Sequence, residues 1–332
     1  MSMESSIEPR LDTEQSVEKR TLNGWRKDTQ KGEKELSSYY KRRAMLEKFF
    51  HGLFLSAALF AVLSVIAIIV LIFSRGLQPF LPNNTWGNYN VWEFLSGLTW
   101  RPSFGEFGVG FMIINSLLVT FGAILLGVPI AILTAVFIAE VAPKPLVKIM
   151  EPAIELLAAI PSVLYGVFGF AVIVPAVGRI SPLTTGDSLL AVVLVLTIMI
   201  LPVIVTMVVA SLRAVPTSYK EGSLALGASK TQTIFQVVLP AAKSGILTGV
   251  VLGIGRAIGE TMAVVLVAGN PEGGLPTTIF SRVRLLTTNI VLEQGYAAEL
   301  HEQMLFSTAV VLFLFIMVIN LTLRKIQKKA GN

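Results

Sequence analysis

Residues 246–268 read ILTGVVLGIGRAIGETMAVVLVA, and this stretch decides the class of protein to which the chain belongs. At about 1.5 Å per residue, a helix of this length spans roughly 30 Å or slightly more, which is the thickness of the hydrocarbon core of a bilayer. Only Arg256 and Glu260 carry charge within it. The sequence therefore predicts a membrane-spanning helix with two charges near its middle.

Arg256 and Glu260 are four residues apart, a spacing that places them on one face of a continuous helix where they can meet. A charge held at mid-membrane costs roughly 2.5 to 3.5 kcal/mol on insertion scales, so a charged residue at this depth is commonly functional. We therefore predict that the pair faces a pathway through the membrane. The alternative is an ion pair that only fixes this helix to its neighbours.

The composition supports an integral membrane protein over its whole length. Of the 332 residues, 53% are hydrophobic and 14% are charged, and the mean hydropathy is +0.71, which lies outside the usual range of soluble domains. The absence of cysteine excludes disulfides, thiolate metal sites and cysteine nucleophiles. His51 and His301 lie far apart along the chain without a partner at ligand spacing, so no metal site is expected.

The apolar segments predict an all-α fold in which residues 1–49 form a polar tail and residues 50–332 form a transmembrane domain. Lys and Arg concentrate in the tail, in the loops near Lys144 and Arg213, and after Arg324, which makes that side cytoplasmic by the positive-inside rule. Both chain termini are then cytoplasmic. The six predicted spans are 50–74, 110–139, 153–177, 188–212, 244–268 and 303–323.

Prolines interrupt two of these spans. A proline in a spanning helix frees a backbone carbonyl and bends the axis, which is tolerated where neighbours or a wet cavity satisfy the freed groups. In the third span Pro161 stands beside Ser162 and follows Glu155, and this combination predicts a helix that faces the pathway. For Pro202 in the fourth span, a simple packing bend is the favoured interpretation.

Two sets of glycines mark the fifth predicted span. Small residues four apart allow two helix backbones to approach closely. Because the two sets lie on different faces of the helix, we predict that one face packs against a neighbour while the other is open. The first set is Gly245, Gly249 and Gly253, and the second is Gly255 and Gly259.

The loop at residues 213–243, between the fourth and fifth predicted spans, has a pattern of its own. Its apolar and small residues predict two short amphipathic helices, with Gly227 at the end of the first and Pro240 at the close of the second. An amphipathic surface at the membrane boundary is typical of a protein-docking site. The alternative is a pair of helices that lie on the lipid headgroups.

The loop resembles the EAA loop of ABC-importer permeases, which contains a glutamate, two small residues, a glycine, and then an aliphatic residue and Leu-Pro. Gly222 stands where the family usually has alanine, and glycine weakens a helix by about 1 kcal/mol. The resemblance implies coupling helices that dock into a groove on an ATP-binding subunit. The matching positions are Glu221, Gly222, Ser223, Gly227, Val237, Leu239 and Pro240.

The next segment, GRAIGETMAVVLVAGN at 255–270, resembles the phosphate-importer permeases of the PstC type. IPSVLYGVFGF in the third span and WRPSFGEFG before the second support the same resemblance, which runs from about residue 50 to the C-terminus. It implies the type I ABC-importer permease fold in the inner or plasma membrane. The implied partners are a second, PstA-type permease, a pair of ATP-binding subunits and an extracytoplasmic phosphate-binding protein.

Translocation of phosphate gives the charged pair a specific role. A guanidinium offers paired, charge-assisted hydrogen bonds to an oxyanion, so Arg256 is the predicted contact. Glu260 is predicted to orient the arginine and moderate its field, with Thr261 as a further hydroxyl donor. Glu155 and Ser162 are the remaining candidates for the pathway.

The energy source is expected on another chain. A phosphate-binding ATPase loop needs a second glycine where GASKT at 227–231 has Ser229. The chain is therefore predicted to be a transport subunit that is not itself an enzyme and holds no cofactor. ATP and Mg²⁺ are expected on the partner ATPase subunit.

Three other functions stay open. The first is an ABC permease for another oxyanion, sulfate or molybdate, which an arginine would also attract. The second is a gradient-driven secondary transporter or channel with Arg256 and Glu260 as a charge relay, although the repeated halves typical of such proteins are not evident. The third is a membrane-embedded enzyme that uses Glu155 and Glu260 as paired carboxylates, which no histidine or cysteine cluster supports.

Overall fold

The structure is a computed structural model that describes residues 42, 43, 45–82, 89–183 and 185–331. The chain divides into two compact units, residues 1–70 and 71–332, which are described separately. In the first unit, residues 45–70 belong to the helix Met45–Phe80, which starts five residues before the predicted span at 50. Most of the predicted polar tail lies outside the described residues.

In the described part of the second unit, the named elements are helices and one small antiparallel hairpin in which Trp100 pairs with Phe107. η1 and η2 are 3₁₀ turns, and η3, η4 and η5 are π-helical turns. The first elements are η1 (Gln78–Phe80), α2 (Val91–Ser96), β1 (Trp100–Arg101), η2 (Pro102–Phe104), β2 (Glu106–Phe107), α3 (Gly110–Val136), η3 (Phe137–Val141), α4 (Lys144–Ala159), α5 (Ser162–Phe168), η4 (Gly169–Ile173) and α6 (Val174–Ile180). The later elements are α7 (Leu189–Arg213), α8 (Thr217–Ala225), α9 (Lys230–Thr233), η5 (Ile234–Val238), α10 (Leu239–Ala241), α11 (Lys243–Gly259), α12 (Met262–Val267), α13 (Leu286–Glu293) and α14 (Glu299–Gly331).

Within the described residues, five continuous helices are long and apolar enough to cross a membrane: Met45–Phe80, Gly110–Val141, Ser162–Ile180, Leu189–Arg213 and Glu299–Gln327. A sixth arises if Lys230–Ala241 and Lys243–Gly259, bent by 70°, count as one span. Two predicted boundaries are wrong. The third span starts at Ser162 because the chain breaks before it, and the fifth does not run to 268 because α11 ends at Gly259.

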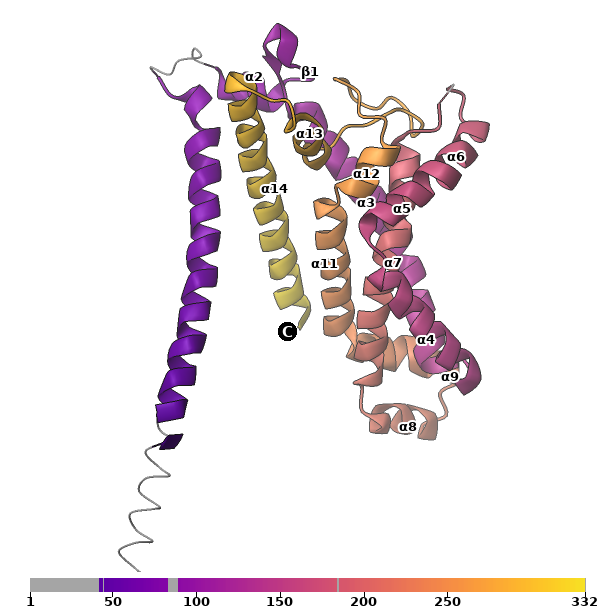
Figure 1. The fold of residues 1–332 in the computed structure, drawn as a ribbon. Helices are drawn as coiled ribbons and strands as arrows, with labels where there is room; N and C mark the ends of the chain where they lie inside the picture. The colour runs from indigo at the N-terminus through magenta and orange to yellow at the C-terminus, as the bar shows by residue number, and fades with distance from the viewer. Residues whose placement is uncertain (1–41, 44, 83–88, 184, 332) are drawn as a thin grey trace, which may run out of the picture. The chain divides into compact units, whose positions relative to one another are not determined.

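α7 forms the centre of the second unit. In its most apolar stretch 67% of the residues are buried, against 28 to 33% in the spans at 110–141, 162–180 and 299–327, which are more exposed in the chain by itself. α3, α4 and α11 pack around it, and in Figure 1 α11 stands between α7 and α14. Pro202 is buried inside α7 without ending the helix, as its interpretation as a packing residue predicts.

The two glycine sets of α11 lie on different faces, as predicted. A Cβ added at Gly253 would lie 2.6 Å from Ile204 Cδ1, and one at Gly249 would lie 3.0 Å from Met207 Cβ, so this face packs tightly on α7. A Cβ added at Gly255 or Gly259 would meet no atom within 4 Å. The second face is therefore open in the chain by itself.

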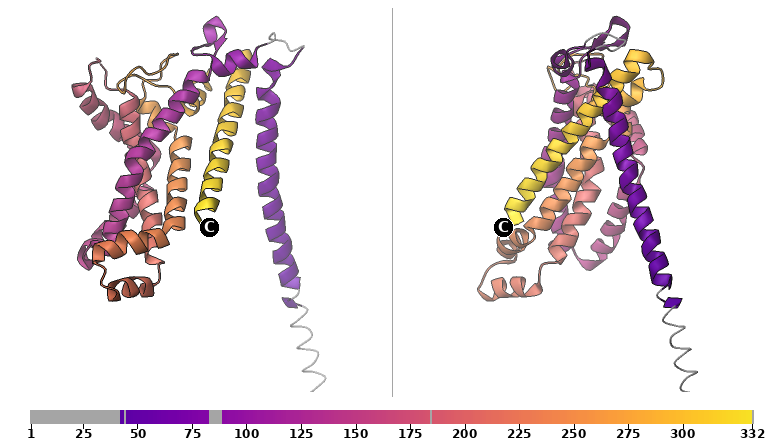
Figure 2. Two further views of the ribbon diagram at one scale, coloured as in Figure 1. Left: turned by 180° about the vertical axis from the view of Figure 1, so that it is seen from behind. Right: turned by 90° about the vertical axis from the view of Figure 1, so that its left-hand side faces the viewer.

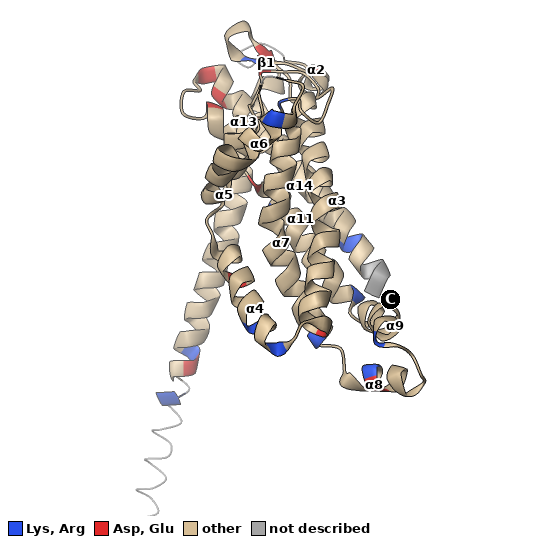
Figure 3. Cartoon of the chain, turned by 90° about the vertical axis from the view of Figure 1, so that its right-hand side faces the viewer, with Lys and Arg blue, Asp and Glu red and all other residues tan. Residues whose placement is uncertain are grey.

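The helices of the second unit connect two contrasting ends, which we name the α13 end and the α8 end after the short helices found there (Figures 1 and 2). At the α13 end, backbone hydrogen bonds join distant loops, such as Trp100 N to Glu272 O at 2.7 Å. A buried ion pair, Arg284–Glu293, lies beneath them. The α8 end carries clustered basic positions around α4, α8 and α9 (Figure 3).

Candidate functional site

The membrane-embedded charges lie at a break in the fifth span. α11 ends at Gly259, Glu260 has extended backbone with ψ 130°, and α12 begins at Met262. Arg256 and Glu260 therefore do not share one face of a continuous helix, and the prediction that they do is wrong. Among the ion pairs of the described residues, none joins Arg256 to Glu260.

Glu260 instead holds the break. Its Oε1 accepts a hydrogen bond from the backbone N–H of Ala263 at 3.1 Å, in the first turn of α12. The first N–H groups of a helix have no partner within the helix, and a carboxylate that accepts from them acts as an N-terminal cap. Because Glu260 is only 8% exposed, its carboxylate supplies in the interior what water supplies at a surface.

Two hydroxyl groups satisfy the carbonyl groups that the break frees. Thr287 of α13 donates to the carbonyl of Glu260 at 3.2 Å, and Thr261 donates to the carbonyl of Gly259 at 3.3 Å. Non-helical backbone at membrane depth is stable only when such groups find partners. The break in the fifth span is thus held by side chains, one of which comes from another helix.

The third span has a break of its own, between α4 and α5. Ile160 and Pro161 have extended backbone, with ψ of 128° and 138°. Proline has no N–H and disfavours helical backbone in the residue before it, so the chain stops its helix here and restarts at Ser162. The Tyr165 hydroxyl donates to the carbonyl of Leu157 across this break at 2.6 Å.

The two breaks lie close to each other because the helices that follow them pack together. A Cβ added at Gly166 of α5 would lie 2.7 Å from the Cα of Ala263 in α12, so glycine permits this approach. Arg256 lies in the last turn of α11, directly before the break that α12 follows. The structure thus places Arg256, Thr261 and Ser162 around two adjacent helix breaks.

Arg256 is the available charge in this arrangement. Its side chain is partly exposed, and among the described residues no hydrogen bond or ion pair occupies its guanidinium. The residues beside it on the open face of α11, Gly255 and Gly259, leave space around it. An anion that enters from this face can therefore reach an unpaired guanidinium at a site where the backbone is irregular.

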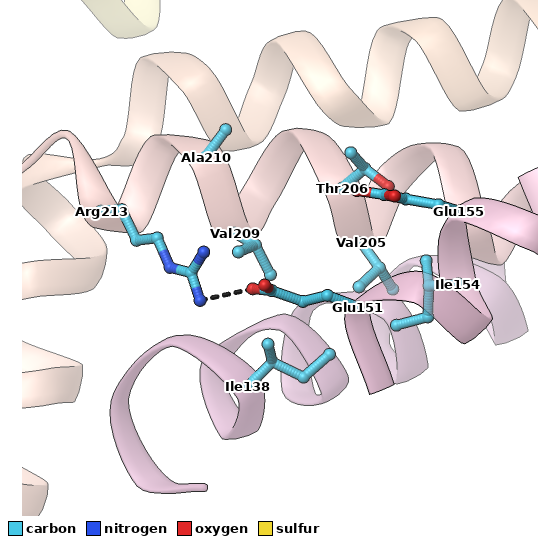
Figure 4. Close-up of a pocket in the computed structure, with 9 residues that line it drawn as sticks. All are labelled: Ile138, Glu151, Ile154, Glu155, Val205, Thr206, Val209, Ala210 and Arg213. Atoms are coloured by element: carbon cyan, nitrogen blue, oxygen red, sulfur yellow. Dashed lines mark ion pairs between the residues drawn. The ribbon is translucent and has the colours of Figure 1, made fainter. Parts of the chain in front are cut away.

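Glu155 lies elsewhere. It lines a pocket of about 180 Å³ between α4 and α7, together with Thr206 and the ion pair of Arg213 with Glu151 (Figure 4). The structure therefore brings Glu155 towards the end of α7 and does not join it to the residues at the two breaks. The prediction of Glu155 as a pathway residue stays untested.

The loop at 213–243 forms two helical segments, as predicted. α8 carries Glu221, Gly222 and Ser223, and Gly227 follows it with φ +88°, a conformation that glycine adopts without strain. The second segment, α9 to α10, contains Val237, Leu239 and Pro240 and ends at Ala241. Leu226 is 92% exposed at the end of α8, so an apolar side chain lies open at the surface of the chain.

Sequence reasoning missed several residues that build these sites. Tyr165 stands in a stretch that the sequence singled out, but nothing in the spacing indicates its bond across the break. Thr287 reaches Glu260 from α13, a contact between positions 27 residues apart. His301, which lacks a partner at ligand spacing, lies with its Nε2 3.0 Å from Glu293 Oε2.

Comparison with known proteins identifies the family. Residues 127–331 match the model of the family described as binding-protein-dependent transport system inner membrane component. The chain is 39% identical to "Probable ABC transporter permease protein YqgH" of Bacillus subtilis (strain 168), over 80% of this chain and 86% of that protein. It is 32% identical to "Phosphate transport system permease protein PstC" of Pasteurella multocida (strain Pm70), over 80% and 90% of the two chains.

Solved structures share the fold. A bacterial ABC transporter involved in the import of the acidic polysaccharide alginate matches with a TM-score of 0.56 at 18% identity, over 82% of this chain and 95% of that chain. An inward-facing MetNI methionine ABC transporter matches with a TM-score of 0.53 at 20% identity, over 66% and 94%. These matches confirm the fold of an ABC-importer permease. The chain belongs to the family of binding-protein-dependent transport system inner membrane components.

Proposed function

We propose that this chain is a membrane-spanning subunit of an ATP-driven importer that carries inorganic phosphate into the cytoplasm. The observation that carries the proposal is the unpaired guanidinium of Arg256 where two broken spans meet. The similarity to proteins named as phosphate transport system permeases supports phosphate as the substrate.

Phosphate carries one to two negative charges near neutral pH, and transfer of an ion into an apolar medium is prohibitive without compensation. A guanidinium compensates with two parallel, charge-assisted hydrogen bonds. Because the Glu260 carboxylate caps α12, it leaves the positive charge of Arg256 for the anion. The hydroxyl group of Ser162 is a further donor near the same position, and that of Thr261 can serve as one only if it leaves the carbonyl of Gly259.

The positive-inside rule gives the orientation that we propose. The α8 end carries most of the basic residues of the loops, so this end faces the cytoplasm and both termini are cytoplasmic. The chain then spans the inner or plasma membrane several times. The basic residues at this end are Lys144, Lys148, Arg213, Lys220, Lys230 and Lys243.

The surfaces of the chain fit the partners of such an importer. The exposed α8, with Leu226, suits the groove of an ATP-binding subunit, which would bind ATP and Mg²⁺. The open face of α11 suits a second permease of the PstA type, so that a pathway forms between the two chains. The α13 end suits an extracytoplasmic phosphate-binding protein.

The proposal is tested with the complete importer reconstituted in proteoliposomes, by measuring phosphate uptake and ATP hydrolysis together. Arg256→Ala should lower uptake by at least about tenfold, because a hydrogen bond to a charged group contributes roughly 1.5 to 3 kcal/mol. Arg256→Lys keeps the charge but loses the bidentate geometry, so its phosphate uptake should lie between that of the wild type and that of Arg256→Ala. Arg179→Ala is the matched control, since Arg179 is exposed at the end of α6.

Normal uptake by both Arg256 variants would refute the role of this residue. Labelled sulfate and molybdate, offered to the same vesicles, test the substrate. Uptake of either in preference to phosphate would overturn phosphate as the cargo. Uptake that persists without ATP but follows an ion gradient would overturn the ATP-driven importer.

A further inference from the structure

Two ion pairs at the α8 end connect α8 and the end of α7 to the earlier elements η3 and α4. Lys220 Nζ in α8 lies 2.6 Å from Glu140 Oε1, in the π-helical turn η3 that ends the second span. Arg213, the last residue of α7, pairs with Glu151 of α4 (Figure 4). Both acidic partners belong to the hairpin that runs from η3 into α4.

The Lys220–Glu140 pair differs from the exposed ion pairs of the molecule. The side chain of Glu140 is 9% exposed and that of Lys220 is 28% exposed, whereas the partners in Arg101–Glu272 are 49% and 69% exposed. An exposed pair contributes little, but removal of one partner from a buried pair leaves a poorly hydrated charge. The contact between α8 and η3 is therefore costly to separate.

This pair is also the side-chain contact that joins α8 to a helix outside the loop, in the part of the chain that the structure describes. Among the side-chain hydrogen bonds and ion pairs of the described residues, the others from α8 stay inside the loop, as between Ser223 and Thr233 at 3.0 Å. Lys220 reaches η3 instead, and only Ala142 and Pro143 separate η3 from α4. Displacement of α8 therefore pulls on the start of α4.

α4 leads directly to the break at Ile160 and Pro161. Beyond that break, α5 packs against α12 beside Arg256. A π-helical turn has one residue more than a regular turn and is commonly found at functional sites, because it allows a local shift of the helix. η3 carries Glu140, the residue with which Lys220 of α8 forms its ion pair.

We propose that the Lys220–Glu140 and Arg213–Glu151 pairs form a second path, by which movement of α8 is transmitted through α4 to the proposed substrate pathway. This inference rests on the proposed importer function. The first path runs along the loop into α11, because α10 is joined to α11 at a 70° bend. With both paths intact, the docking helix moves the breaks of the third and fifth spans together.

The test uses the complete reconstituted importer and measures phosphate transported per ATP hydrolysed. Glu140→Gln removes the charge from the hairpin and leaves α8 unchanged, so the ATPase should still bind while the ratio falls about fivefold to tenfold, within the usual range of coupling between sites. Lys220→Glu alone should lower it similarly. The double variant Glu140→Lys with Lys220→Glu should return the ratio to within about twofold, as expected for a pairwise interaction.

The exchange Arg101→Glu with Glu272→Arg is the control, since this pair is exposed and joins loops at the α13 end. A wild-type ratio in Glu140→Gln would overturn the proposal. A charge-exchanged variant that assembles but is as poor as the single variants would also overturn it. If Lys220→Glu releases the ATPase in a pull-down, Glu151→Gln replaces it, because this variant breaks the other ion pair and leaves α8 intact. The amount of phosphate transported per ATP should then fall in Glu151→Gln, and a wild-type ratio would overturn the proposal.

Failure of the importer function would appear differently. In that case the wild-type complex would show no ATP-dependent phosphate uptake, and no variant could change a ratio. If the wild-type complex takes up phosphate, the ratios of the variants show whether transmission runs through the loop alone or also through the ion pairs.

Discussion

The breaks in the third and fifth spans perform the same task by different means. At Ile160–Pro161, covalent chemistry interrupts the helix, because proline lacks an N–H and holds its neighbour extended. At Glu260–Thr261 no proline is present, and side chains hold the backbone open. The first break has a covalent cause that does not depend on other helices, whereas the second depends on contacts that can be lost.

This difference indicates where the pathway can change shape. The Glu260 break depends on Thr287, which belongs to α13, so a shift of α13 relative to α11 alters it. The break at Pro161 keeps its shape and moves together with α4. We expect the fifth span to be the element that switches and the third to be the element that follows.

Glu260→Ala should have the largest effect of the variants at the two breaks. The variant leaves the Ala263 N–H without its acceptor at membrane depth, and loss of a cap with an unpaired buried donor should lower the free energy of unfolding by about 2 to 3 kcal/mol. Glu260→Gln keeps an oxygen that can accept the same bond, so most of the stability should remain. Unfolding of the purified chain in mixed micelles measures both.

The glutamine variant separates the cap from the charge. Phosphate uptake that is lost in Glu260→Gln at near-normal stability would show that the negative charge matters for transport. A glutamine variant as unstable as the alanine variant would contradict the capping role.

Thr287→Val tests the contact between α13 and the break with a smaller expected effect. Valine has the shape of threonine without its hydroxyl, so the carbonyl of Glu260 loses the donor at 3.2 Å. An unsatisfied buried acceptor costs about 1 to 2 kcal/mol. Thr287→Ser is the control because it keeps the hydroxyl, and equal destabilisation of the two variants would show that the methyl group matters instead of the hydrogen bond.

Much of the fold follows from local chemistry that the sequence displays. The apolar runs predicted the long helices, Pro161 predicted the break in the third span, and Gly227 predicted the end of the first loop helix. Glycine spacing predicted that the two glycine sets of α11 lie on different faces, one packed and the other open. Each of these depends on a residue's own backbone preference or on the periodicity of its neighbours.

The break at Glu260 could not be predicted in this way. Glycine, glutamate and threonine are all compatible with a helix in an apolar run, so a continuous span to residue 268 was the simplest interpretation. What ends α11 is a set of contacts with Ala263 and with Thr287, which become neighbours only after the chain has folded. The Lys220–Glu140 pair could not be predicted for the same reason, since its partners are 80 residues apart in the sequence.

Tyr165→Phe should have the smallest effect of these variants, because it removes a side-chain bond at the break that Pro161 already causes. The carbonyl of Leu157 would lose the Tyr165 hydroxyl at 2.6 Å, but it keeps the backbone N–H of Ile160 at 3.3 Å. Because one partner remains and Pro161 still interrupts the helix, the free energy of unfolding should fall by only about 0.5 to 1 kcal/mol. The same unfolding measurement as for Thr287→Val gives the comparison, and a loss equal to that of Thr287→Val would mean that side chains hold both breaks alike.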